Sequence, residues 1–148
     1  MLNTILPSET ISKIHSLLKY LHDSYQGYDE CAQMIQDNFL KEKFISAAVQ
    51  RQDMINSLEE ILISNKVMPK DSGTLTGAAH RMLVALKAFI TDHDTAAILK
   101  EVERGENSLI DMYQETLIAV DNPQIKSLLQ KQLTSVQNDL AKWEFAES

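Results

Sequence analysis

The sequence is poor in residues that form tight turns and flexible linkers. It contains 4 glycines and 3 prolines among 148 residues. This is too few for a β-sandwich with many turns or for a disordered linker. It also contains 1 cysteine, which excludes an intrachain disulfide and a cluster of thiolate metal ligands.

Long apolar runs are absent as well. No segment approaches the roughly 18 apolar residues that a membrane span requires. The opening segment, MLNTILPSET, has no basic region ahead of its apolar residues, so we expect no signal peptide. From these two absences we predict a cytoplasmic protein that does not partner a membrane.

The sequence has fewer basic than acidic residues. The chain has 14 Lys and Arg against 21 Asp and Glu, a net charge of -7 at pH 7. Such an excess of negative charge disfavours binding to nucleic acid or to an anionic membrane surface, so neither is expected as a partner. The composition is otherwise that of an ordinary globular chain, and the length suits one domain covering residues 1–148.

Apolar residues recur three and four positions apart along the whole chain. This spacing is typical of amphipathic helices, and nothing in the sequence indicates a strand. We therefore predict an all-α protein with four long helices and one shorter helix. The expected long helices cover residues 9–36, 39–65, 93–120 and 122–144, and the shorter helix covers residues 73–90.

Polar residues at the expected helix starts favour these boundaries. Short polar side chains accept hydrogen bonds from the free backbone N–H groups of a first turn. The expected capping residues, in chain order, are Ser8, Asp71 or Ser72, Thr91 in a capping box with Asp94, and Asn122 before Pro123.

The short helix determines the expected topology. Short turns make the first two helices an antiparallel hairpin, and likewise the last two. A helix of about 18 residues is long enough to carry the chain back along the outside of a bundle. The second and fourth helices should therefore run parallel. This is a four-helix bundle with an additional crossover helix between the second and third long helices, as in ferritin-like bundles.

Two segments carry a resemblance to a known family. An SGxxxGxxHR motif covers residues 72–81, and an ERGE motif covers residues 103–106. With them, nearly the whole chain resembles bacterial ferritin-like four-helix-bundle proteins of unknown function. That family often has an acidic residue near the position of Tyr25 or Gln26 and a histidine near that of Leu140, and this chain has neither. The resemblance thus implies the fold more than any activity.

A di-metal carboxylate centre is the most specific functional hypothesis for such a bundle. It needs an inward Glu from each of two helices and a Glu-x-x-His pair from each of the other two. The sequence has no Glu-x-x-His, and Glu30 is expected to face water. Inward acids reduce to Glu106, the best single metal candidate, and Glu103. We therefore predict no cofactor and no di-iron or di-manganese centre.

Two charged residues fall within apolar stripes, Arg51 on the second helix and Glu106 on the fourth. An unpaired charge there would cost several kcal/mol, so pairing is one expectation. Escape to the surface through the long side chains is another. A pair would be either a structural salt bridge or a small-ligand site. The candidate buried polar site comprises Arg51, Glu106, Tyr25, Tyr113 and Glu103.

The remaining residues of note are most simply explained by helix packing. Gly27 and Gly105 lie inside expected helices, where each costs about 1 kcal/mol relative to alanine. Close helix approach or relief beside a bulky neighbour would explain them, and a local bulge at a site is the alternative. The pair His80-Arg81 lacks an orienting acid and a nucleophile, so no catalytic residue is predicted. Cys31 is expected to be a packed or half-exposed thiol.

The functional prediction is a non-enzymatic ferritin-like bundle with a structural, interaction or stress-related role. A homodimer formed through a long apolar flank is compatible with it. Two alternatives stay open at this point. One is a metal-dependent oxidase or metal-storage protein with a degenerate site. The other is a bundle that binds a ligand or partner through a middle lined by Tyr and Arg.

Overall fold

The chain folds into five α-helices. A computed structural model describes residues 6–69 and 75–147, and within these ranges it contains no strand. None of the helices in them has both the length and the apolar character needed to cross a bilayer. The all-helical prediction is confirmed. The helices are α1 (Ser8–Met34), α2 (Asn38–Ser64), α3 (Gly77–Thr91), α4 (Thr95–Ala119) and α5 (Pro123–Glu147).

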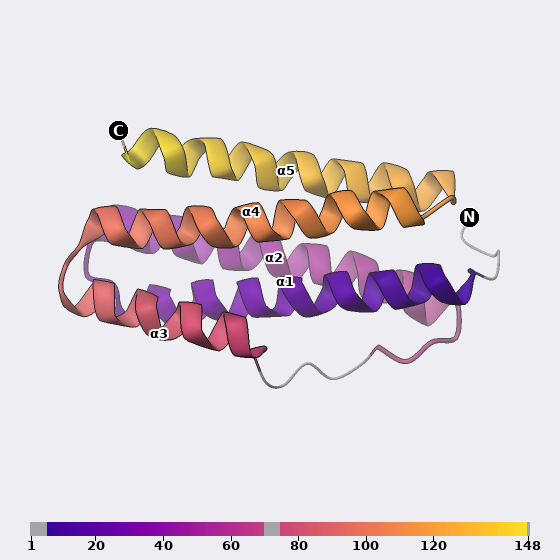
Figure 1. The fold of residues 1–148 in the computed structure, drawn as a ribbon, viewed down its shortest axis with the longest axis horizontal. Coiled ribbons are helices and arrows are strands. Elements are labelled where there is room, and N and C mark those ends of the chain that lie inside the picture. Colours follow the sequence, from indigo (N-terminus) through magenta and orange to yellow (C-terminus); the bar gives the residue numbers. More distant parts are fainter. Residues whose placement is uncertain (1–5, 70–74, 148) are drawn as a thin grey trace.

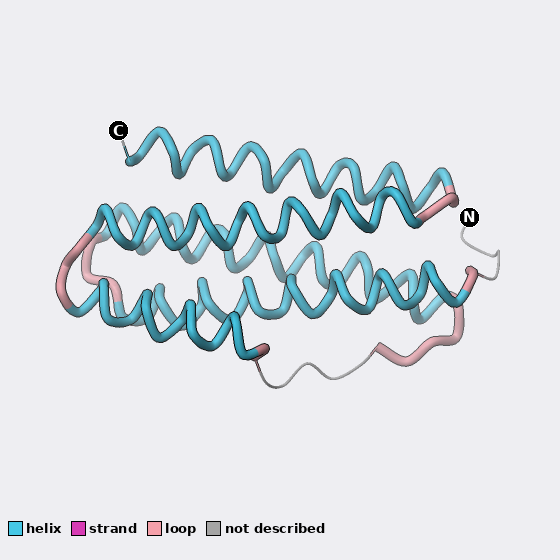
Figure 2. Tube along the Cα trace, in the orientation of Figure 1, coloured by secondary structure: helices cyan, strands magenta, loops and turns pink. Residues whose placement is uncertain are grey.

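Figures 1 and 2 show how the helices are arranged. The four long helices lie side by side, and the shorter α3 covers one half of the bundle, against α1 and α4. α1 and α2 form an antiparallel hairpin, as do α4 and α5. α2 and α4 run in the same direction (Figure 1), as a single crossover between the two hairpins requires.

Side-chain caps begin four of the helices, and three of these caps are Asp or Asn residues. Asp37 accepts a hydrogen bond from the Leu40 N–H at 2.9 Å, at the start of α2. Asn122 accepts from the N–H groups of Gln124 and Ile125, both at 3.0 Å, at the start of α5. Asp94 accepts from the Ala97 N–H at 3.1 Å and begins α4.

Two expected caps were wrong. Ser8 is already the first helical residue of α1, and the N-cap residue Pro7 makes no side-chain hydrogen bond. Thr91 ends α3 instead of capping α4, because its hydroxyl donates to the Lys87 carbonyl oxygen at 2.9 Å. Asp94 alone therefore caps α4, which begins at residue 95 instead of 93.

α3 begins later than the short helix predicted for residues 73–90. Thr76 is extended, and its hydroxyl oxygen caps α3 by accepting from the Ala79 N–H at 3.1 Å. The alternative caps Asp71 and Ser72 lie outside the described residues. α3 therefore has 15 residues, about 22 Å of helix, and it covers only half of the bundle (Figure 1).

The apolar core consists of two clusters separated by charged residues. The larger joins α1, α2, α4 and α5 at the end of the bundle that α3 leaves uncovered. The smaller lies at the end that α3 covers, where the Trp143 ring stacks on Tyr28, with centroids 6.2 Å apart, and meets the edge of Phe44 at 5.4 Å. Arg51 and Glu106 are buried but belong to neither cluster.

Candidate functional site

A buried ion pair crosses the centre of the bundle. Arg51 of α2 has none of its surface exposed, and Glu106 of α4 has 2%. The Arg51 Nη2 lies 2.5 Å from the Glu106 Oε2. The structure thus brings together the two charged residues that the sequence places on inward stripes. Each compensates the other's loss of hydration, which would be costly for either alone.

The remaining donors of the Arg51 guanidinium are also engaged. Its Nε donates to the Ser24 Oγ of α1 at 3.0 Å, and its Nη1 donates to the Gln50 side-chain oxygen. The same Nη1 lies 3.6 Å from an Asp139 oxygen of α5. The guanidinium carbon lies 5.6 Å from the centroid of the Tyr28 ring, within cation–π range.

The charge states of this cluster follow from its contacts. Burial by itself would lower the pKa of Arg51, but the Glu106 carboxylate raises that pKa above its usual range. Burial and the nearby Glu106 carboxylate hold the pKa of Tyr28 well above its usual value. At neutral pH the cluster therefore contains a charged guanidinium and a neutral phenol.

A cavity of about 320 Å³ lies between α1, α3 and α4 and reaches this cluster. Its lining includes Glu106, Tyr28 and Ser24. The volume is at the lower end of the range of small-molecule sites, about 300–1,000 Å³. Most other lining residues are apolar, among them Leu75, Met82, Leu83, Leu86, Val102 and Leu109.

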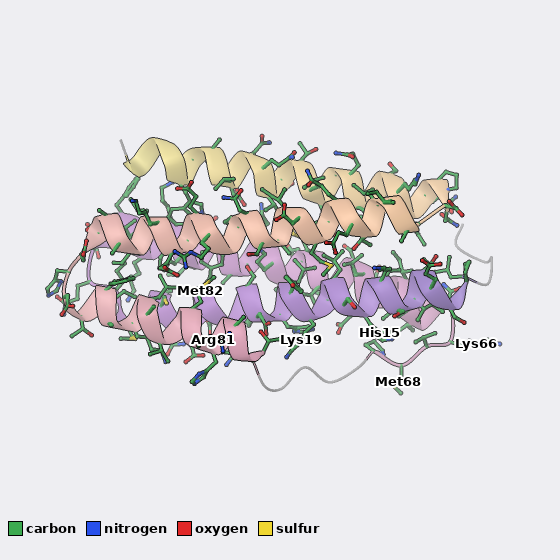
Figure 3. The ribbon with its side chains drawn as sticks, viewed as in Figure 1. His15, Lys19, Lys66, Met68, Arg81 and Met82 are labelled. Atoms are coloured by element: carbon green, nitrogen blue, oxygen red, sulfur yellow. The ribbon has the colours of Figure 1, made fainter. Side chains whose placement is uncertain are left out.

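Both helix-interior glycines line the cavity. A Cβ at Gly27 would meet nothing within 4 Å, so close helix approach does not explain this glycine. A Cβ at Gly105 would lie 3.2 Å from the Met82 sulfur, and Figure 3 shows Met82 on the side of α3 toward α4. Gly105 thus gives room to a bulky neighbour, whereas Gly27 leaves space open. Neither glycine has a positive φ.

Two further carboxylates belong to the lining, Asp23 of α1 and Glu101 of α4. The Thr76 hydroxyl donates to the Asp23 Oδ2 at 3.1 Å and thereby ties the start of α3 to α1. Burial raises the pKa of Asp23, and the nearby Lys19 only partly offsets this effect. The Glu101 side chain is 14% exposed and lies 3.6 Å from the Arg104 guanidinium.

Three residues predicted for the site lie elsewhere. Tyr25 is half-buried against both apolar clusters and does not line the cavity. Tyr113 donates to the Gln132 side-chain oxygen at 2.8 Å instead of to Glu106. Glu103 is half-buried and outside the lining.

Tyr28, on the same inward stripe as Tyr25, is the tyrosine that approaches Arg51 and Glu106. It is therefore the site residue that the prediction missed. The stripe pattern was the available signal, but it does not distinguish the two tyrosines.

A di-metal centre does not fit these residues. Within the described ranges, no three His, Cys, Asp or Glu side chains are grouped so as to hold a metal ion. Glu106, the best single candidate, already has a cationic partner in Arg51. Glu30 does not simply face water, because it accepts hydrogen bonds from Lys87 at 2.9 Å and from Gln26 at 3.0 Å.

Of the other residues considered in the sequence analysis, His80 and Arg81 lie at the surface and Cys31 lies at the cavity. His80 and Arg81 are exposed, and Figure 3 shows Arg81 on the outer side of α3. Cys31 is 1% exposed and lines the cavity. Burial raises the pKa of its thiol to about 11, so the thiol stays protonated at neutral pH.

Comparison with known proteins gives a family but no activity. Residues 9–119 match the model of a family described as "Domain of unknown function (DUF2383)". The matched range includes all the cavity-lining residues together with Arg51. No curated protein matches the sequence significantly.

Proposed function

The chain belongs to the DUF2383 family, and we propose that it is a non-enzymatic, ferritin-like bundle that binds a small, largely apolar molecule. The proposed binding site is the cavity between α1, α3 and α4. Its volume and its apolar lining are those expected of a small-molecule site. The cavity favours the ligand-binding alternative over a purely structural role.

Gly27 is the single observation that carries this proposal. A glycine inside a helix costs about 1 kcal/mol relative to alanine. Here no backbone conformation requires it, and no neighbour lies within 4 Å of where a Cβ would be. A side chain at this position would project into the cavity. The glycine therefore reduces helix stability while it keeps the cavity open, as expected if the space has a use.

The neighbouring polar groups support binding more than catalysis. A general base must reach a substrate proton, and a nucleophile must be activated. The Glu106 Oε2 is held by Arg51, and burial keeps Cys31 protonated. Arg51 and Tyr28 also have partners within the protein. Arg51, Glu106 and Tyr28 hold one another in place, and Cys31 is not ionised, so none of these four groups is activated for reaction.

The ferritin-like part of the proposal rests on helix direction. The parallel course of α2 and α4, with α3 between them in sequence, supports a four-helix bundle with one crossover. The alternative of a metal-dependent oxidase or storage protein has weaker support, because Glu106 is already paired with a cation. The homodimer, the cytoplasmic location and the lack of a nucleic-acid partner stay predictions.

Ligand binding can be tested with three probes of similar apolar body: phenethyl alcohol, phenethylammonium and phenylacetate. The single tryptophan, Trp143, reports binding by its fluorescence, because it stacks on the cavity residue Tyr28. The rate at which a small thiol reagent labels Cys31 is the second readout, since this residue also lines the cavity. We expect at least one probe to change the fluorescence saturably and to slow the labelling.

The decisive variant is Gly27→Leu, which fills the cavity from α1. We expect probe affinity to fall about tenfold or more, a difference of about 1.4 kcal/mol, with the free energy of unfolding unchanged or raised. The control is Ala141→Leu, an apolar addition at an exposed position of α5. The proposal is wrong if no probe binds the wild-type protein, or if Gly27→Leu binds as tightly as Ala141→Leu.

A further inference from the structure

We infer that the ligand of the cavity is an organic cation, an ammonium or similar protonated nitrogen attached to an apolar body. This inference rests on the proposed binding function and adds the ligand class. It is drawn from the charges of the lining. Among the described residues that line the cavity are three carboxylates, and there is no lysine, arginine or histidine.

The three carboxylates differ in how well the protein already compensates them. Glu106 is 2% exposed and paired with the fully buried Arg51, so this pair contributes little net charge. Asp23 and Glu101 have side chains that are 12% and 14% exposed. These two carry the less well compensated charge of the lining.

The basic partners of these two carboxylates lie outside the lining. Lys19 is 3.6 Å from Asp23 and 31% exposed, and Arg104 is 3.6 Å from Glu101 and 72% exposed. Ion pairs with exposed or partly exposed groups, as Arg104 and Lys19 are, are weakened by solvent and by salt. The carboxylates themselves are mostly buried, where a charge interacts more strongly. A cation inside the cavity would therefore compensate them better than the present partners do.

Asp23 provides further support. Burial raises the pKa of its carboxyl group, although Lys19 and the Thr76 hydroxyl act in the opposite direction. The protein thus holds this negative charge at a cost. A bound ammonium would relieve this cost, whereas a bound carboxylate would increase it.

The rest of the lining suits the apolar body of such a ligand. Tyr20 and Phe44 contribute aromatic rings, and Met82 contributes a flexible thioether that adapts to irregular shapes. The α3 residues Ala78 and Ala79 are small. The cavity therefore combines an apolar wall with negative charge, and the matching ligand carries one positive group on an apolar skeleton.

The three probes of the binding experiment also test this inference, because they differ in charge and have closely similar bodies. At neutral pH we expect phenethylammonium to bind about tenfold more tightly than phenethyl alcohol, and phenylacetate to bind most weakly. Dissociation constants come from Trp143 fluorescence and from protection of Cys31. The preference should decrease at high salt, as expected for an electrostatic contribution.

The test variant is Asp23→Asn combined with Glu101→Gln, which removes both weakly compensated charges and keeps the side-chain shapes. We expect the ratio of its affinities for phenethylammonium and phenethyl alcohol to fall from about ten to about one. The control is Asp111→Asn combined with Asp53→Asn. It makes the same change in net charge at exposed positions and should keep the preference.

Two results would overturn the inference and leave the binding function standing. One is equal affinity of the wild-type protein for the ammonium and the alcohol. The other is a preference for the ammonium that persists in the Asp23→Asn, Glu101→Gln variant. If no probe binds at all, or if the Gly27→Leu variant binds normally, the proposed function itself fails and the inference fails with it.

Discussion

Arg51 connects all four long helices through one side chain. From α2 it reaches Ser24 of α1, Glu106 of α4 and Asp139 of α5. A buried ion pair is weak support for stability in itself, because dehydration offsets most of the attraction. Its geometry nevertheless requires the helices to keep one relative register. We therefore assign this residue a role in fixing how the helices align.

Removal of the Glu106 carboxylate tests this role. We expect Glu106→Ala to lower the free energy of unfolding by about 3–5 kcal/mol, because it leaves the Arg51 guanidinium buried without its closest anion. Urea denaturation followed by circular dichroism measures the change. Glu103→Ala is the control, since Glu103 lies on the same helix and is only half-buried.

A second variant separates the charge from the packing. Arg51→Met combined with Glu106→Leu removes both charges and keeps apolar volume, so it should recover much of the lost stability. A change within about 0.5 kcal/mol for Glu106→Ala would contradict the assignment, because changes of that size are typical of surface positions.

For the individual residues, the sequence predicted part of the site. Charged residues on apolar stripes identified Arg51 and Glu106, because a charge at an inward helical position needs a partner. The same stripe holds Tyr25 and Tyr28, and periodicity treats them alike. Only the neighbouring helices determine that Tyr28 approaches the pair.

Among the elements, α3 has the fewest buried residues. Its buried residues are Leu83, Leu86 and Ile90, and none of them lies between Gly77 and Met82. Its start is tied to α1 by the hydrogen bond from Thr76 to Asp23. Since α3 forms one wall of the cavity, we expect this hydrogen bond to help hold that wall in place.

The ion pair between Glu30 of α1 and Lys87 of α3 should make α3 sensitive to pH. The Lys87 hydrogen bond lowers the pKa of Glu30 from its usual value. The stabilisation is therefore present above about pH 4.5 and is lost as pH falls through the pKa of the folded state. We expect the amide hydrogens near Lys87 to lose protection as the pH falls below about 4.5.

Hydrogen exchange with mass spectrometry, corrected for the intrinsic rate at each pH, measures this loss. Glu30→Gln should abolish the pH dependence in the peptide that contains Lys87, and Asp29→Asn should retain it. Asp23 acts with the opposite sign at the other end of α3. Its pKa is raised, so its contribution is greatest at low pH and is lost as pH rises. Equal pH dependence in Glu30→Gln and wild type would contradict the assignment.

In the whole molecule, two apolar clusters lie on either side of a charged centre, with a cavity beside it. The charged centre is compensated internally, and Glu106 has a guanidinium as its partner. A metal ion at this position would have to displace that guanidinium. The arrangement thus favours a bundle whose central cation is a side chain.

The metal content of the purified protein tests whether the central cation is a side chain and not a metal ion. Protein purified without chelators should contain well under one equivalent of iron, manganese or zinc per chain by elemental analysis, because a lone paired carboxylate is a poor ligand set. Stoichiometric metal in the wild-type protein that disappears in Glu106→Gln would contradict this prediction. The same measurement on Glu103→Gln controls for metal bound loosely to acidic surface.

The sequence by itself determined the helices and the faces they bury. These features depend on local periodicity and on caps a few residues away, such as Asn122 before Pro123. Tertiary structure decided what no local pattern contains: that Tyr28 joins Arg51, that α3 covers half of the bundle, and that Gly27 opens onto a cavity. The physical reason is that a cavity and an ion pair between helices depend on side chains from several helices at once, and therefore on how those helices pack.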